Sequence, residues 1–175
     1  MLSYFPVMYP DEILYSVIAR YHKYSGNAQV RQTINDLFGN KSDSSSVILP
    51  AHLNHFSEQV FSFGISFEEL LYNRTLFPFF ALFQSDQFIQ NVIKWTEENS
   101  GKTEFDRYAM WRKSAQTSEH LRYCPACLVE DSKRYGEQYW HRQHQIIGVS
   151  VCTSHKTVLC DSNIPHYIDP QKYQL

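Results

Sequence analysis

Residues 124 to 155 read CPACLVEDSKRYGEQYWHRQHQIIGVSVCTSH and hold three of the four cysteines of the chain. Two short pairs stand out in this stretch, Cys-x2-Cys at Cys124 and Cys127 and Cys-x2-His at Cys152 and His155. Two ligands separated by two residues can turn onto one ion, and two such pairs complete the tetrahedral sulfur and nitrogen shell that Zn²⁺ prefers. The stretch therefore predicts one structural zinc site. Because protein would fill all four positions, the metal is expected to organise the fold and not to activate water.

Three further residues in or near this stretch are candidate ligands. His141 and His144 form a His-x2-His pair, but apolar neighbours such as Trp140 favour a packed segment, which we take to be a helix, and a structural role. Cys160 comes shortly after the second pair, and two interpretations of it stay open: a buried free thiol, or the start of a further element. Residues 128–135 are predicted to be helical, while residues 149–151 and 157–159 have the β-branched character of short strands. A treble-clef or ribbon-like finger with an inserted helix is expected.

The N-terminal half shows the apolar periodicity of several short helices. The predicted boundaries are, in order, an Asp11 cap and a Gly26 stop, a start near Val30 and a Gly39 stop, Pro50 in a first turn, a Ser66 cap spaced for Glu69, and a Ser85 cap with a stop near Gly101. Residues 40–46, NKSDSSS, are expected to be a mobile polar loop between two helical groups. Such helices are compatible with a helix-turn-helix unit and equally with a plain helical bundle.

These patterns together predict a mainly α fold with a small zinc-binding α+β module. We divide the chain into a helical domain over residues 1–106 and a zinc-finger domain over residues 107–175. With 175 residues and 43% apolar content, the chain can bury a genuine core. The apolar block at residues 76–83 is interrupted by Pro78 and falls far short of the roughly 20 residues that span a bilayer, so it is predicted to be core. Unpaired cysteine usage and the lack of a signal sequence predict a cytoplasmic protein.

Charge is distributed unevenly between the two halves. Residues 1–106 carry 7 basic and 12 acidic side chains, whereas residues 107–175 carry 9 basic and 6 acidic ones. The acidic half would meet phosphate groups with like charge and is poorly suited to bind them. In the basic half, Arg and Lys residues interleaved with aromatic residues can bind phosphates and stack on bases. A solvated charged face would have the same composition, so this alternative stays open. The candidate nucleic-acid contacts are Arg112, Lys113, Arg122, Lys133, Arg134 and Arg142.

Three segments in the same order resemble one family. The runs YCPACLVED and YWHRQHQIIGVSVCTSH resemble the zinc-finger signature of the TniQ/TnsD family, which selects target sites for transposons, including CRISPR-associated ones. The opening FPVMYPDEILYSVIARYHKYSGN and the Leu-Pro-x-His-Leu element at residues 49–53 are similar to further segments of that family. This resemblance implies a helix-turn-helix in the N-terminal half and a bacterial adaptor that marks an insertion site. It also implies recruitment of a TnsC-like AAA+ ATPase, with DNA reached directly or through an RNA-guided CRISPR complex.

Three functional classes follow from these observations. We favour the non-enzymatic adaptor, in which exposed aromatic side chains of the opening segment would bind the ATPase and the basic half would contact DNA or a guide complex. The predicted anchors are Tyr4, Phe5, Tyr9 and Tyr15, and for Tyr4 and Phe5 packing against the first helix stays an open alternative. The alternatives are a zinc-containing transcription factor that binds DNA as a homodimer, and a metal-dependent nuclease with His141 or His144 as its base. Against the nuclease, the sequence contains no compact carboxylate cluster that could hold a catalytic Mg²⁺.

Overall fold

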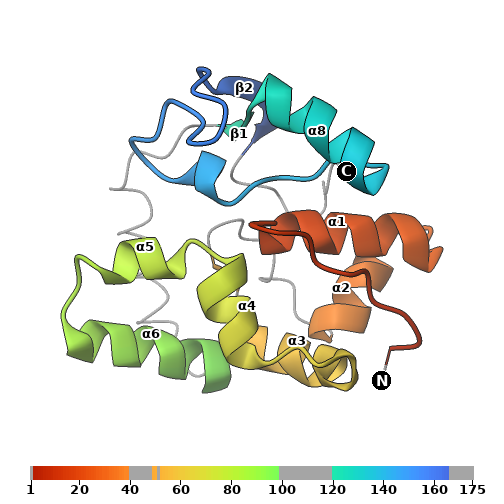
Figure 1. Ribbon diagram of the computed structural model, residues 1–175. Helices are drawn as coiled ribbons and strands as arrows, with labels where there is room; N and C mark the ends of the chain where they lie inside the picture. The colour runs from red at the N-terminus through yellow and green to blue at the C-terminus, as the bar shows by residue number, and fades with distance from the viewer. Residues whose placement is uncertain (1, 40–48, 51, 99–119, 166–175) are drawn as a thin grey trace.

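The computed structural model describes residues 2–39, 49–50, 52–98 and 120–165, which form a helical body and a small module beside it (Figure 1). The helical body comprises α1 (Leu14–Ser25), α2 (Val30–Phe38), α3 (Leu53–Val60), the 3₁₀ turn η1 (Phe61–Phe63), α4 (Phe67–Arg74), α5 (Phe77–Ala81) and α6 (Asp86–Glu98). The module comprises β1 (His120–Tyr123), α8 (Pro125–Tyr135), the 3₁₀ turn η2 (Gln143–Gln145) and β2 (Cys160–Pro165). The described part of the chain is therefore mainly helical with a small two-stranded sheet, as predicted.

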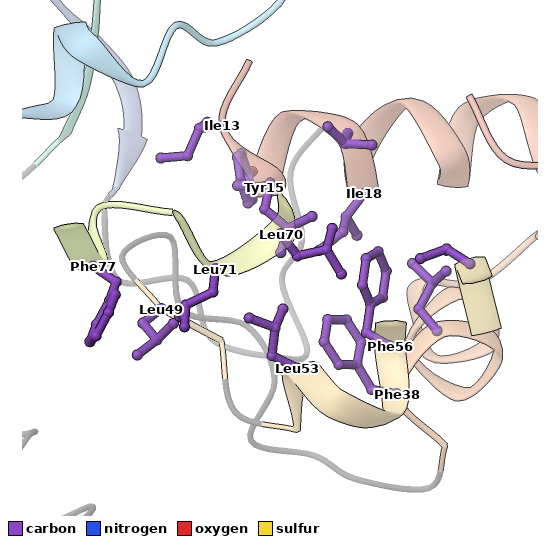
Figure 2. Close-up of a cluster of buried hydrophobic side chains, with 14 of the residues drawn as sticks. Ile13, Tyr15, Ile18, Phe38, Leu49, Leu53, Phe56, Leu70, Leu71 and Phe77 are labelled. Carbon is purple, nitrogen blue, oxygen red and sulfur yellow. The ribbon is translucent and has the colours of Figure 1, made fainter. Parts of the chain in front are cut away.

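A single hydrophobic cluster joins the helices of the body. Helix α3 lies at its centre and packs against α2, α4 and α6. Phe56 of α3 stacks on Phe38 of α2 with ring centroids 5.1 Å apart. Figure 2 shows side chains from several helices and from the segment before α3 converging on this centre, among them Ile13, Tyr15, Ile18, Leu49, Leu53, Leu70, Leu71 and Phe77. Full burial of each large apolar side chain contributes about 1.5–3 kcal/mol to the free energy of unfolding.

This core continues into the module. Leu121 of β1 is fully buried and belongs to the same cluster, and Trp140 and Ile147 pack against its edge. In Figure 1 the module lies against α1, while α3 and α6 lie on the far side of the helical body. The predicted division between residues 106 and 107 lies outside the described residues, so the domain boundary stays a prediction.

Several helix boundaries agree with the sequence analysis because they depend on local chemistry. Gly26 and Gly39 follow α1 and α2 with positive φ angles of 79° and 68°, a conformation that glycine adopts without steric cost. The Ser66 hydroxyl accepts a hydrogen bond from the Glu69 amide at 3.2 Å, and Ser85 caps α6 in the same way at 3.3 Å. The predicted loop at residues 40–46 and the predicted helix stop near Gly101 lie outside the described residues.

Two predicted helix starts are wrong. Helix α1 begins at Leu14 with no side-chain cap, and Asp11, at a φ of 54°, makes its contacts with the module instead. Helix α3 begins at Leu53 after His52, so Pro50 lies before the helix and not in its first turn. In both cases the residue that resembles a helix-start signal lies in the segment that leads into the helix and not at its cap or in its first turn.

The apolar block at residues 76–83 is only partly core. Phe77 and Phe80 are buried, but Leu82 and Phe83 are 78% and 73% exposed at the turn that follows α5. The prediction that the whole block is buried is therefore wrong. Among the helices that the structure describes, none combines the length and the apolar character needed to cross a membrane.

The sheet also differs from the expectation. Its strands are β1 and β2, which pair antiparallel with Arg122 opposite Asp161 and Tyr123 opposite Cys160. The segments predicted as strands, residues 149–151 and 157–159, form a single isolated bridge between Val151 and Val158. The β-branched residues there close a tight turn, and the regular strand begins at Cys160, one residue after the predicted segment.

Candidate metal centre

The four predicted metal ligands meet at one point in the module. One ligand atom from each of Cys124, Cys127, Cys152 and His155 lies within 4.8 Å of all the others. The Nδ1 atom of His155 is 3.3 Å from the sulfur of Cys127 and 3.7 Å from the sulfurs of Cys124 and Cys152. Tetrahedral zinc with bonds of about 2.3 Å places neighbouring ligand atoms about 3.8 Å apart, so this arrangement fits such an ion. All three cysteines are buried, as a closed structural site requires.

Local structure sets the direction of each ligand pair. Cys124 is the N-cap residue of α8 and Pro125 occupies the first turn, so Cys127 faces the same point as Cys124 from within that turn. The second pair lies in a tight turn closed by hydrogen bonds from the Cys152 amide to Thr157 and from the Lys156 amide to Cys152, of 2.8 and 2.9 Å. The helix start and the turn thus bring two sequence-distant pairs together.

Outer contacts hold two of the ligands. The Nε2 atom of His155 lies 3.2 Å from a carboxylate oxygen of Glu130 on α8, which leaves Nδ1 for the metal. The hydroxyl of Thr157 lies 3.0 Å from the Cys124 sulfur. Burial acts to raise the pKa of Cys124, but hydrogen bonds from Thr157 and nearby backbone amides outweigh it and lower this pKa to about 7. Burial, together with the neighbouring thiols, raises the pKa of Cys127 instead. A bound cation would require both thiols as thiolates.

The His-x2-His pair lies beside the centre, in the packed and structural role that the sequence analysis favoured. His141 Nε2 is 2.8 Å from a carboxylate oxygen of Asp131, and the His141 ring stacks on Tyr139 with centroids 4.4 Å apart. His144 is 1% exposed, and burial followed by the charges of His141 and Arg122 lowers its pKa to about 4. The expectation of a helix around this pair is wrong, because the only helical element there is the three-residue turn η2.

Gln145 fastens this segment to the strand that precedes the first ligand pair. Its side-chain oxygen accepts the Arg122 amide at 3.0 Å, and its side-chain nitrogen donates to the carbonyls of Arg122 and His141 at 2.8 and 3.1 Å. The guanidinium of Arg122 in turn donates to the carbonyls of Ile146 and Val149. Gln145 therefore fixes the backbone at Arg122, and Arg122 fixes the backbone that follows Gln145, next to the metal centre.

Backbone hydrogen bonds attach the module to the start of α1. The Ile13 amide donates to the Trp140 carbonyl at 2.9 Å, and the Trp140 amide donates to the Ser16 hydroxyl at 3.1 Å. The Arg142 amide donates to the Asp11 carbonyl at 2.7 Å. The module is thus hydrogen-bonded to the residues just before α1 and to Ser16 in its first turn.

An ionic network, buried at Glu12 and Arg20 and partly exposed at Glu137, lies at the same junction. The Glu137 carboxylate accepts hydrogen bonds from the hydroxyls of Tyr9 and Tyr24 at 2.9 and 2.6 Å and from Arg20 at 2.8 Å. These bonds outweigh the effect of burial and lower the pKa of Glu137. Arg20 also pairs with Glu12, which is 0% exposed, and burial raises the pKa of that carboxyl despite the opposing bonds. Two acidic groups from distant parts of the chain share one buried guanidinium.

The predicted nucleic-acid contacts occupy different environments. Arg112 and Lys113 lie outside the described residues. Arg122 is held by carbonyls inside the module, and Arg142 donates to the Tyr72 carbonyl and lies 3.5 Å from Asp11. Lys133 and Arg134 are exposed on the last turn of α8. Contact with nucleic acid by any of the six stays a prediction.

The four aromatic residues predicted as exposed anchors differ in burial. Tyr4 is 41% exposed and stacks on Tyr21, whereas Phe5 and Tyr15 are 6% and 2% exposed and belong to the core. Tyr9 stacks on Tyr135 with centroids 4.4 Å apart, and the Arg20 guanidinium covers its ring at 3.9 Å. Phe5 therefore takes the packed alternative, with its ring 5.9 Å from that of Tyr21 on α1, and the exposure predicted for Tyr15 is wrong. Partner contact by these residues stays a prediction.

The sequence analysis missed Glu137, Asp131 and Gln145. Glu137 and Gln145 bond to residues that are far away in the chain, since Glu137 comes 117 positions after Arg20 and Gln145 comes 23 positions after Arg122. No local pattern marks such a partner. Asp131 had a weak signal, since it lies four residues after Cys127 on α8 and therefore on the same face of the helix.

The structure is a helical body bonded to a small module that carries a Cys₃His cluster. Comparison with known families identifies the class of protein to which it belongs. The model of the TniQ family matches residues 3–159, and the chain belongs to that family, as its sequence predicted. The chain is similar to the Transposon Tn7 transposition protein TnsD of Escherichia coli, with 28% identity over 152 residues. That alignment covers 86% of this chain and 30% of the relative, so the chain spans about 30% of the length of the curated protein it matches.

Proposed function

We propose that this chain is a non-catalytic adaptor that selects target sites for DNA transposition. The observation that carries the proposal is the family match over residues 3–159, which includes the opening segment, the metal centre and the contacts that join them. The similarity to a transposition protein supports the same process. The chain would mark an insertion site and recruit a TnsC-like AAA+ ATPase, with DNA reached directly or through an RNA-guided complex.

The metal in this proposal is one structural Zn²⁺. Three cysteine sulfurs and one histidine nitrogen form the donor set that zinc accepts in closed tetrahedral sites. With four protein ligands, the ion would leave no position for a reacting water. Its contribution would be to hold α8 and the turn at residues 152–155 together, and through them the segment at residues 140–142 that is hydrogen-bonded to the start of α1.

The proposed roles are divided between two exposed surfaces. The last turn of α8 carries Lys133 and Arg134, whose charges are open to solvent and suited to phosphate groups. Tyr4 is the exposed member of the four predicted anchors and lies at the start of the helical body. Tyrosine is among the residue types enriched at the positions that dominate protein interfaces, and the ring of Tyr4 stacks on that of Tyr21. We therefore assign DNA or guide-complex contact to Lys133 and Arg134, and ATPase contact to Tyr4.

Binding measurements on three variants test this assignment. Tyr4→Ala is expected to weaken binding of the TnsC-like ATPase by about 5- to 30-fold and to leave DNA binding unchanged. Tyr72→Ala is the matched control, because Tyr72 is 43% exposed against 41% for Tyr4 but lies on α4. Lys133→Glu combined with Arg134→Glu is expected to weaken DNA binding and to reduce its dependence on salt. If ATPase binding survives Tyr4→Ala unchanged while DNA binding is lost, the two roles are assigned the wrong way round.

A further inference from the structure

His144 is a buried polar side chain that touches the metal centre without belonging to its ligand set. Its Nε2 atom lies 3.9 Å from the Cys127 sulfur, whereas His155 Nδ1 approaches that sulfur to 3.3 Å and the other two to 3.7 Å. The group of four atoms that converge within 4.8 Å of one another includes His155 and not His144. From this placement we infer that His144 is a positioning residue, which donates its Nε2–H to the Cys127 thiolate and fixes that ligand for the metal.

This role fits the surroundings of Cys127. Cys124 has an outer partner in Thr157, and His155 has one in Glu130, but both of those partners are exposed and water could replace them. His144 is 1% exposed and Cys127 is 5% exposed, so water has little access to this sulfur. A buried thiolate depends on hydrogen bonds from the protein, because each such bond lowers the cost of burying its charge.

The orientation of His144 is set from two sides. Its ring lies 4.9 Å from that of His141, and His141 is fixed in turn by Asp131, one turn after Cys127 on α8. On the other side, Gln145 anchors the η2 turn to the backbone of Arg122. The His-x2-His pair thus clamps the first turns of α8, with His144 on Cys127 and His141 on Asp131.

The inference rests on the zinc site proposed above, and its test measures metal binding directly. The zinc dissociation constant is measured by chelator competition, and the Co²⁺-substituted protein is examined for its sulfur-to-cobalt charge-transfer absorption. His144→Leu removes the donor at similar volume and is expected to weaken zinc binding by about 10- to 100-fold and to shift the cobalt absorption. His144→Gln keeps a side-chain N–H at a similar reach and is expected to restore most of the affinity. Cys160→Ser, a thiol outside the centre, is the control and is expected to bind zinc as the wild type does.

The outcomes separate this role from the others. If His144→Leu binds zinc as tightly as the wild type with an unchanged cobalt spectrum, the positioning role is wrong and the zinc site stands. If Leu and Gln weaken binding equally, His144 acts through packing alone and the inference is again wrong. A wild-type chain that binds no metal would overturn the zinc site and this role together. Far-ultraviolet circular dichroism on each variant identifies any loss of affinity that comes from unfolding.

Discussion

Cys152→Ser is expected to release the metal and to unfold the module that α8, β1 and β2 form. The Cys152 sulfur is fully buried and lies 3.7 Å from both the Cys127 sulfur and His155 Nδ1, so its loss opens the centre. Zinc in small structural sites contributes on the order of 10–16 kcal/mol, which equals or exceeds the whole stability of a typical domain at about 5–15 kcal/mol. Zinc content and thermal unfolding of the purified variant measure the effect.

Cys160→Ser provides the matched control for this prediction. Cys160 is the first residue of β2, pairs with Tyr123 across the sheet and is absent from the converging group of ligands. A serine there is expected to keep the zinc and to change the melting temperature little. Loss of zinc from Cys160→Ser, or a Cys152→Ser variant that keeps it, would show that the ligand set is assigned incorrectly.

Arg20→Met is expected to destabilise the protein by about 3–5 kcal/mol. The change removes the only positive charge that the structure places against Glu12 within the described residues, and Glu12 is 0% exposed. It also removes one of the three donors to Glu137, which fastens the module to the helical body. Breaking a buried ion pair on one side costs this much because the remaining carboxylate stays buried with no opposite charge and keeps only the hydrogen bonds from the Tyr9 amide and the Ser16 hydroxyl. Chemical denaturation monitored by circular dichroism gives the loss in free energy of unfolding.

Two further variants show whether the uncompensated charge is the cause. Arg31→Met changes an exposed arginine on α2 and is expected to stay within about 0.5 kcal/mol of the wild type. Glu12→Gln added to Arg20→Met is expected to recover part of the loss, because the buried charge is then gone. A double variant less stable than Arg20→Met alone would show that the unpaired charge of Glu12 is not the cause of the loss in stability.

Features that depend on a few adjacent residues were predictable from the sequence. The spacing of the two ligand pairs marked the metal centre, since each pair closes within one turn of backbone. Gly26, Gly39, Ser66 and Ser85 marked helix ends, because a positive φ angle or a hydroxyl cap acts on its own neighbours. The membership of the TniQ family was also predictable, from three separate motifs in one order.

Features that depend on contacts between distant residues were not predictable. Asp11 looks like a helix cap, but its carboxylate accepts the Gln143 amide from a segment 132 residues away. In the sequence nothing distinguishes Glu137 from an ordinary surface glutamate, yet Tyr9, Tyr24 and Arg20 all donate hydrogen bonds to its carboxylate. For Phe5 the sequence left an exposed anchor and a packed residue equally open, because a single aromatic residue in an extended segment does not reveal which side faces the core. Such choices are made by tertiary packing, which the local pattern does not encode.

Hydrogen exchange at the Ile13 amide tests whether the metal centre and the opening segment act as one unit. This amide donates to the Trp140 carbonyl, so its protection depends on the module, while the Leu128 amide in the first turn of α8 reports the centre itself. Exchange is measured on the zinc-loaded chain and again after the zinc is removed with a chelator. We expect both amides to be protected with zinc and to lose protection together without it. An Ile13 amide that stays protected while the Leu128 amide exchanges freely would show that the metal centre and the opening segment are two independent units.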